Sequence, residues 1–519
     1  MATRARSRPR RPGVVYRLGH WVDDRVGAAH FARTALDKIF PDHWSFMLGE
    51  IAMYCLVVLI LTGIYLTFFF SPSSHDVVYH GSYGPLRGLH MSEAYHSTIR
   101  LSFDIRAGLV FRQIHHWAAL IFIASIVTHL CRIFFTGAFR KPRELNWIVG
   151  VSLLLLAIAN GFTGYSLPDD LLSGTGLRIA YSIVLGIPFL GTWLAFLFFG
   201  GEFPSTALEP RLFVLHILLV PALIIGLLTV HLAILWRQKH TQFRGPGRTE
   251  RNVVGSYLWP TYTLRSIGLF AAVAALLSAL GGLAQINPVW LYGPFKAAAV
   301  STAAQPDWYV GWLEGALRLA PAWRVHIFGY TISEVFWPGI LLPGITFGLL
   351  YLWPFLEERF THDHLEHHLL DSPRERPVRT AIGVGVLAFY IILVVAGAQD
   401  IVAQKLGVGI PTVTNTLRVL LFVLPALFAY FTWRTCHDLE KKGAREEDYP
   451  RPYPKARTPY QVTDEAASSS ASAAPAEAPR RSAAGRGLAA LGAAVAAAGG
   501  FLIGRRRPKK IVFEQTRKK

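Results

Sequence analysis

Long apolar stretches with almost no charged residues recur along the 519-residue chain. Each is about 20 residues long, the length that an α-helix needs to cross the hydrocarbon core of a bilayer. The stretches are Phe46–Phe70, Leu109–Phe135, Trp147–Leu167, Leu212–Trp236, Leu264–Leu283, Ser333–Phe355, Ala381–Ala398 and Leu417–Trp433. This pattern predicts an all-α integral membrane protein with about eight transmembrane helices.

The polar connections between these stretches alternate in their density of Arg and Lys. The segments Arg132–Arg143 and Arg237–Arg251 are dense in both residues, as is the N-terminal tail, whereas 71–107, 168–210 and 284–332 carry fewer per residue. Cytoplasmic loops of membrane proteins carry the excess of positive charge. We therefore predict a multi-pass protein with a cytoplasmic N-terminus, and we place the two longest connections, 168–210 and 284–332, on the outer side.

Composition agrees with this class, since 52% of residues are hydrophobic and only 16% are charged. The formal net charge is +19. Because the basic residues alternate in step with the apolar stretches, they fit a membrane topology, and no nucleic-acid partner is expected. Three cysteines and the absence of a C-x-x-C-H motif exclude a covalently attached c-type haem in this sequence.

Four histidines lie inside two of the predicted spans, His115 and His129 in one and His216 and His231 in the other. Ionisable groups inside a membrane are costly and usually functional. A separation of fourteen residues is within about 40° of whole helical turns, so His115 and His129 share one face, roughly 21 Å apart. The second pair is fifteen residues apart, about 60° off whole turns, and Pro221 or a π-bulge could absorb the extra residue. Two facing helices could thus supply two bis-imidazole haem sites.

His116 competes with its neighbour for the ligand position. It is thirteen residues from His129, about 140° away from the face of that residue. We assign the ligand to His115 and expect His116 beside it or at the membrane interface.

Glycines repeat at the same pitch as the histidines. Gly49 and Gly63 are fourteen residues apart in the first span, and Gly150 and Gly164 are fourteen apart in the third. Small residues also serve simple helix packing in membranes. The spacing shared with the histidines favours haem, because glycine lets a bulky group approach the backbone.

Two arginines lie close to the histidines of the second span. Arg112 precedes His115 by one turn, and Arg132 follows His129 by three residues. A guanidinium at these positions is placed to pair with haem propionates. Snorkelling to the membrane interface is compatible with that role.

Over residues 40–360 the sequence resembles the cytochrome b family of respiratory and photosynthetic quinol oxidoreductases. The motifs that carry the resemblance are Leu48–Gly63, Arg112 to Arg132, Gly161–Pro168 (GFTGYSLP), His216 with His231, and Pro306–Tyr309 (PDWY). The resemblance implies a four-helix bundle with two haems b. His115 and His216 would hold the low-potential haem near the outer face, and His129 and His231 the high-potential haem near the cytoplasm.

The segments 168–178, 305–323 and 376–383 are similar to the actinobacterial branch of this family. That similarity implies a bacterial plasma-membrane complex with a Rieske iron–sulfur subunit and a dihaem cytochrome c subunit. It also implies menaquinone as the quinone, association with a cytochrome aa-type oxidase in a supercomplex, and a homodimer of the complex.

The resemblance further implies quinol oxidation at the outer face with bifurcated electron transfer and proton translocation. Asp307, which replaces the glutamate of the family signature, is the expected base. Tyr309 is the second residue expected to be catalytic. Asp307 could instead cap the helix that starts at Trp308. The implied quinone-binding residues are Tyr165, Pro168, Gly176, Pro306 and Trp308.

Several positions depart from the mitochondrial pattern of the family. Asp169 and Asp170 replace Trp-Gly and form either a proton exit or a solvated loop end. At the inner quinone site, Trp236 and Ser266 stand where that branch has histidine and aspartate, which leaves Arg265 or Glu50 as candidates. Four histidines at 362, 364, 367 and 368 suggest a metal site, but we favour a solvated interfacial loop.

The chain divides into five predicted parts. They are a cytoplasmic segment (1–43), the dihaem bundle (44–240), a region with the outer quinol-site loop (241–360), two additional transmembrane helices (361–435) and a cytoplasmic tail (436–519). Within the tail, Gly487–Gly504 is apolar but mostly Ala and Gly. It is either a ninth span or a surface segment held near anionic membrane lipid, and weak insertion of these residues favours the second.

Two other functions compete with this interpretation. A dihaem membrane anchor of a dehydrogenase would also use membrane histidines, but it would lack the PDWY loop and the paired glycines. A transporter would show repeat symmetry and broken helices at the midplane. The glycine spacing and the PDWY motif favour cytochrome b over both.

Overall fold

A computed structural model of the chain describes residues 13–299 and 305–441. The chain forms two compact units. The larger consists of Ile39–Ser256 and Pro260–Ala444 and contains all the predicted site residues. The described helices of the smaller unit are α1 (Val14–Val26) and α2 (Ala28–Leu36). The segment Gly487–Gly504 lies outside the described residues.

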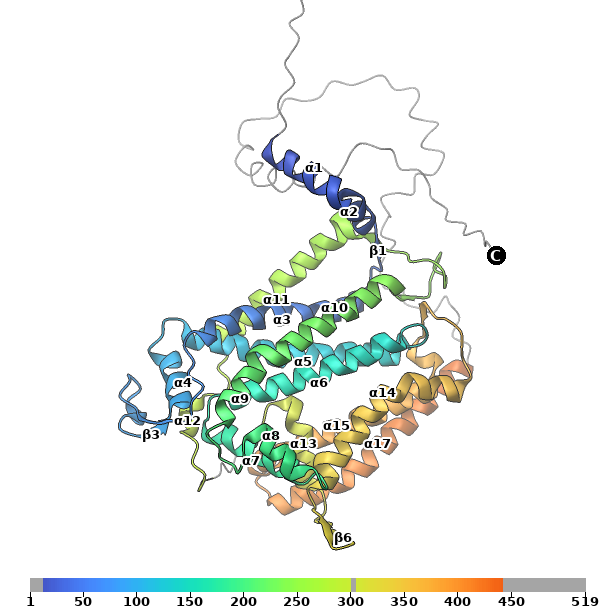
Figure 1. Cartoon of the computed structure of the whole chain (residues 1–519). Helices are drawn as coiled ribbons and strands as arrows, with labels where there is room; N and C mark the ends of the chain where they lie inside the picture. Colours follow the sequence, from blue (N-terminus) through green and yellow to red (C-terminus); the bar gives the residue numbers. More distant parts are fainter. Residues whose placement is uncertain (1–12, 300–304, 442–519) are drawn as a thin grey trace, which may run out of the picture. The chain divides into compact units, whose positions relative to one another are not determined.

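Within the described ranges, eight helices are long and apolar enough to cross a membrane. Their main parts are α3 (Leu48–Thr67), α5 (Gly108–Phe135), α6 (Glu144–Ser166), α10 (Val220–Gln238), α11 (Thr263–Leu283), α14 (Leu342–Thr361), α15 (Pro377–Gly397) and α17 (Ile410–Lys441). Each coincides with one predicted stretch, so the all-α membrane class and the eight spans are confirmed. Figure 1 shows these helices as the main body of the larger unit.

Several spans are extended by turns of different pitch. A 3₁₀ turn, η1 (Trp44–Met47), leads into α3. The span that ends with α10 begins with α9 (Leu208–Val214) and a π-helical turn, η3 (Leu215–Leu219). A further π-helical turn, η5 (Trp337–Leu341), leads into α14. The segment η4 (Leu258–Tyr262), which precedes α11, is interrupted by the extended backbone of Trp259.

The connections carry short helices and very short strands. The helices are α4 (Glu93–Phe103), α7 (Leu171–Leu185), α8 (Gly191–Phe199), α12 (Val289–Tyr292), α13 (Trp308–Leu319) and α16 (Gln399–Leu406). Antiparallel pairs join β2 (Asp76–Val78) to β3 (His90–Ser92) and β6 (Val325–Ile327) to β7 (Tyr330–Ile332). A parallel pair joins β4 (Gln242–Phe243) to β8 (Leu369–Leu370). The two long connections that are predicted to lie on the outer side are therefore built around α7 and α8, and around α12 and α13.

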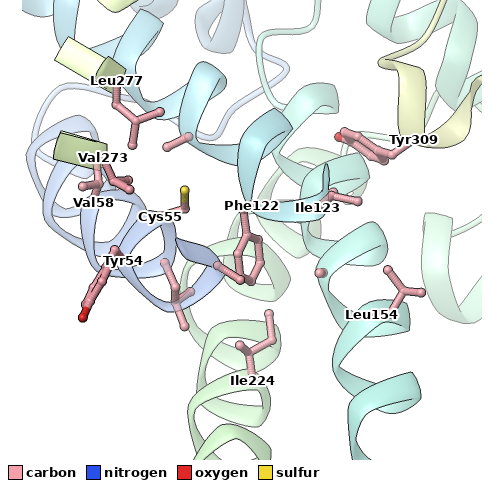
Figure 2. Packing of buried hydrophobic residues seen from close by; sticks show 14 of the residues in the cluster. Tyr54, Cys55, Val58, Phe122, Ile123, Leu154, Ile224, Val273, Leu277 and Tyr309 are labelled. Carbon is pink, nitrogen blue, oxygen red and sulfur yellow. The ribbon is translucent and has the colours of Figure 1, made fainter. Parts of the chain in front are cut away.

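The main core lies among α3, α5, α6, α10 and α11. Cys55, Ile123 and Leu277 are almost completely buried there. Figure 2 shows these side chains together with Phe122 and Ile224 in one packed cluster. Because lipid tails are as apolar as these side chains, close packing rather than the hydrophobic effect holds such helices together.

Candidate functional site

His115 and His216, which are predicted to lie near the outer face and are called the outer pair below, face a shared space between α5 and the helix that contains η3. The ring centroids of His115 and His216 are 6.2 Å apart. A glycine of another helix lies against each ring. A Cβ added at Gly63 on α3 would be 3.2 Å from Cε1 of His115, and one at Gly164 on α6 would be 2.3 Å from Cε1 of His216. No side chain larger than hydrogen fits at Gly164 unless the imidazole moves.

Hydrogen bonds fix how these two rings are oriented. The Thr62 hydroxyl donates to the Val58 carbonyl at 2.7 Å, so its oxygen is free to accept from Nδ1 of His115, 2.9 Å away. Nδ1 of His216 lies 3.0 Å from the carbonyl oxygen of Asn160, to which it can donate. With the proton on Nδ1, each Nε2 keeps its lone pair, the form of imidazole that binds a metal.

The inner pair repeats this geometry on the same helices. A Cβ added at Gly49 would lie 3.4 Å from Cε1 of His129, and one at Gly150 would lie 3.6 Å from Cε1 of His231. Nδ1 of His129 is buried and has no hydrogen-bond partner within the described part of the chain. Each of the four predicted glycines is thus the residue beside one of the four predicted histidines.

The fifteen-residue separation of His216 and His231 is absorbed by a change of pitch. The π-helical turn η3 spans Leu215–Leu219 and contains His216. A π-helical turn holds one more residue than an α-helical turn, and it brings His216 toward the face of His231. Of the two explanations that the sequence allowed, the structure supports the π-bulge.

Arg112 is buried and Arg132 is partly buried, and the hydrogen-bonding groups of both are only partly satisfied. Arg112 donates from Nη2 to the carbonyl of Asn287 at 2.8 Å, and its Nε has no partner among the described residues. The guanidinium carbon of Arg132 lies 4.2 Å from the centroid of the Phe46 ring. Its Nε and Nη2 likewise have no hydrogen-bond partner among the described residues. Buried guanidinium groups without an anionic partner are costly, so these two sites suit an anionic ligand.

A cavity of about 570 Å³ connects the outer histidine pair with the PDWY segment. Its lining includes His115, His216, Tyr165, Pro168 and Asp307. A volume of this size falls within the usual range for cofactor and small-molecule sites. The cavity therefore brings the predicted outer-site base to the same space as one predicted pair of ligands.

A smaller cavity of about 60 Å³ holds other predicted quinone-site residues. Tyr165, Gly176 and Pro306 line it, together with Glu314 of α13, a residue that sequence reasoning missed. Trp308 lines neither of these two cavities and is 39% exposed at the start of α13.

Asp307 occupies the N-cap position of α13, but its side chain makes no capping hydrogen bond. Its Oδ1 lies 2.9 Å from Nε2 of His116, and its Oδ2 accepts from the Tyr309 hydroxyl at 3.1 Å. The capping alternative is therefore wrong for this carboxylate. Burial, together with the charge of Asp307, raises the pKa of Tyr309 well above its usual range, so the phenol stays a neutral donor.

Asp169 and Asp170 have different surroundings. Asp170 caps α7, accepting from the backbone N–H groups of Leu172 at 3.0 Å and Ser173 at 3.3 Å. Only 1% of Asp170 is exposed, so the solvated loop end is wrong for this residue. Burial raises the pKa of Asp169 to about 6.

Near the N-terminal end of α3, Glu50 is the centre of a hydrogen-bond cluster. Its carboxylate accepts from the hydroxyls of Tyr54 at 3.1 Å and Ser266 at 2.7 Å, and also from Tyr262. Arg265 turns away and pairs with Asp42 at 2.5 Å. Of the two candidates for the inner quinone site, Glu50 is the one surrounded by hydroxyl groups. Tyr54 and Tyr262, which supply two of these hydroxyls, were not predicted.

The histidines near residue 365 pair separately. His364 lies 2.7 Å from Glu358, His367 lies 3.0 Å from Asp363, and His368 lies 2.9 Å from Arg143. Across residues 13–299 and 305–441, no three His, Cys, Asp or Glu side chains are grouped to hold a metal ion.

Known proteins resemble this chain over most of its length. The family described as "Cytochrome b(N-terminal)/b6/petB" matches residues 120–294. The cytochrome bc1 complex cytochrome b subunit of Mycobacterium leprae (strain TN) is 51% identical over 82% of this chain and 78% of that protein. Its counterpart in Streptomyces coelicolor is 48% identical over 84% of this chain and 80% of that protein.

A solved structure titled "Hyperthermophilic respiratory Complex III" has the same fold. Its TM-score is 0.61 at 19% sequence identity, and the match covers 80% of this chain and 99% of that chain. Together with the eight apolar helices, these likenesses identify a multi-pass bacterial membrane protein. The chain belongs to the cytochrome b family, as a cytochrome b subunit of the cytochrome bc complexes found in actinobacteria.

Proposed function

We propose that this subunit oxidises quinol at the outer membrane face and carries one of the two electrons inward through two haems b. The observation that carries the proposal is the repeated arrangement of a histidine facing a glycine at four positions. A packing role alone would not place four imidazoles against four glycines at matched heights in the membrane.

The residues present fit haem b at both levels. His115 and His216 would hold one iron, His129 and His231 the other, and the glycines leave room for the flat macrocycle. Arg112 and Arg132 offer buried N–H groups that have no partner in the described part of the chain, and these groups suit the propionates. Bis-imidazole haem supplies reversible one-electron transfer and leaves no open iron position.

Quinol oxidation releases two electrons and two protons, and the chain supplies the proton acceptor. The Asp307 carboxylate lines the cavity, and His116 and Tyr309 hold it from two sides. Asp307 accepts the protons of the two quinol hydroxyls in turn, and it passes the first toward the outer face before it accepts the second. One electron leaves to a Rieske iron–sulfur subunit, and from there to a dihaem cytochrome c subunit; the other leaves inward.

Other parts of the proposal concern topology and assembly. The N-terminus lies in the cytoplasm, so protons from the Asp307 site are released outside and the inner quinone site lies near Glu50. The quinone is menaquinone, and the complex is a homodimer that joins a cytochrome aa-type oxidase. Asp169 stands beside the outer site as a candidate for the proton exit.

Haem content of the purified complex tests the proposal. We expect about two haems b per chain by pyridine haemochrome, and one after His115→Ala or His231→Ala. His80→Ala is the matched control, because His80 is exposed, and it should keep both haems. A well-assembled wild-type complex without haem b would refute the function, and loss of haem in neither ligand variant would refute the assignment.

A further inference from the structure

We propose that Asp400 is a positioning residue for the outer quinol site, through its bonds to Gln305 and Arg318. Asp400 lies on α16, which follows α15 and is far from the PDWY motif in sequence. The inference rests on the proposed function, since it concerns the same quinol site.

The contacts of Asp400 form a compact network with two arms. Both carboxylate oxygens accept from Nε2 of Gln305, each at 2.7 Å. Oδ1 also accepts from Nη1 of Arg318 at 3.0 Å. Arg318 continues the network, because its Nε donates to Glu314 at 2.9 Å.

Each arm ends at a wall of the quinol site. Gln305 immediately precedes Pro306 and Asp307, so the first arm anchors the segment that carries the proposed base. Glu314 lines the smaller cavity with Pro306, so the second arm sets the position of a carboxylate there. One side chain on α16 thus holds two parts of the site that are nine residues apart.

The network is shielded from solvent and charged. The side chains of Arg318 and Asp400 are each 18% exposed, and Glu314 is 12% exposed. Burial alone would raise the pKa of Asp400, but the hydrogen bond and charge of Arg318 outweigh it and lower that pKa. Asp400 is therefore an anion that receives charge-assisted hydrogen bonds, which are shorter and stronger than neutral ones.

The body of α13 is held independently of Asp400. A Cβ added at Gly315 would lie 1.8 Å from the carbonyl oxygen of Leu393, so α13 and α15 touch through their backbones. Arg418 of α17 donates from Nε to the Leu319 carbonyl at 2.9 Å and closes the far end of α13. Removing the charge of Asp400 therefore loosens Gln305 and Arg318 without removing the helix.

Steady-state kinetics of the purified complex with Asp400→Asn test the inference. Loss of one acceptor and of the negative charge should lower kcat/KM for quinol roughly tenfold to a hundredfold, as expected when reacting groups shift by up to an ångström. Haem content and the redox spectra should be unchanged, and Asp400→Glu should recover part of the activity. Glu334→Gln, which breaks the exposed Arg324–Glu334 pair, is the control and should keep the wild-type rate.

Gln305→Leu removes only the hydrogen bonds between Gln305 and Asp400. It tests the inference even if the Asp400→Asn complex does not assemble. We expect Gln305→Leu to lower kcat/KM with both haems retained, and the double variant to lose no more than Asp400→Asn. Wild-type kcat/KM in either single variant, or additive losses in the double variant, would overturn the inference. An inactive or haem-free wild type would instead overturn the proposed function, so the two failures are distinguishable.

Discussion

Replacing Gly164 by alanine is the sharpest test of the proposed outer haem site. The added Cβ would lie 2.3 Å from Cε1 of His216 and 2.9 Å from both ring nitrogens. Ordinary van der Waals contact begins at 3.4 Å, so the ring must recede by about 1.1 Å, whereas metal–ligand distances tolerate about 0.2 Å. The Asn160 carbonyl also holds the ring at Nδ1. We therefore expect Gly164→Ala to lose the outer haem.

The other three glycines provide a graded series. The corresponding distances are 3.2 Å at Gly63, 3.4 Å at Gly49 and 3.6 Å at Gly150, measured to Cε1 of the facing histidine. Alanine at Gly63 requires a shift of only a few tenths of an ångström, and alanine at Gly49 or Gly150 makes ordinary contact. Gly226, with nothing within 4 Å of an added Cβ, lies on α10 and is the matched control.

Haem content and optical redox titration of each purified variant measure the effect. Gly164→Ala should fall from about two haems per chain to about one, and the surviving haem should titrate as the high-potential component. Gly226→Ala should keep both haems. If Gly164→Ala keeps two haems with unchanged potentials, the geometry at His216 does not describe the ligand position. Equal loss in Gly226→Ala would show general instability of the bundle.

Three further outcomes follow from single contacts. Thr62→Val removes the hydrogen-bond acceptor at Nδ1 of His115 and makes that imidazole a weaker electron donor to iron. The midpoint potential of the low-potential haem should therefore rise by tens of millivolts in a redox titration, and the control Thr67→Val should leave it unchanged. Asp307→Asn should lower kcat for quinol oxidation about a hundredfold or more with both haems present, and an unchanged kcat would exclude Asp307 as the base. Burial raises the pKa of Asp169 from 3.8 to about 6, so the folded state binds this proton more tightly than the unfolded state, and stability falls as pH rises through that interval. Asp169→Asn should therefore stabilise the folded state at pH 8 by up to ~3 kcal/mol, seen as a higher midpoint temperature when thermal unfolding is followed by the haem spectrum. Little gain is expected near pH 4, and equal gains at both pH values would contradict this account.

The spans were predictable because bilayer thickness sets a length and the apolar stretches satisfy it. The ends were less predictable, since a helix can continue beyond the apolar run. The last stretch was predicted to begin at Leu417, but α17 begins at Ile410. Backbone hydrogen bonding carries the helix through polar residues such as Thr412 and Asn415, whose presence lowers hydropathy without breaking the helix.

The placement of histidines against glycines was partly predictable because both repeat along single helices. Contacts between distant segments were not. His116 meets Asp307 across 191 positions of sequence, and Tyr262 meets Glu50 across 212. No periodicity within one helix encodes such a pair, because it depends on how two helices are stacked in height and rotation. Glu314 was missed for the same reason.

The outer site is divided between two halves of the sequence, so its geometry depends on how α11 meets α5. His116 comes from α5, and Asp307 lies on the chain that leaves α11. A Cβ added at Gly281 of α11 would lie 2.4 Å from Cγ1 of Ile114, which shows that the helices touch at this height. In a membrane, where lipid competes equally for apolar surface, a close approach of this kind is a main source of helix association.

Hydrogen bonds then set the register at that contact. The Gln113 side chain donates to the Ile286 carbonyl at 2.7 Å and accepts from its N–H at 2.8 Å. The Trp117 indole donates to the Ala284 carbonyl at 2.8 Å. These bonds come from the residues on either side of His115 and His116, and they hold the exit of α11 at the level of the outer histidine pair. The bond between His116 and Asp307 adds to these contacts, so α5 supplies both one histidine of the outer pair and a partner for the proposed proton acceptor.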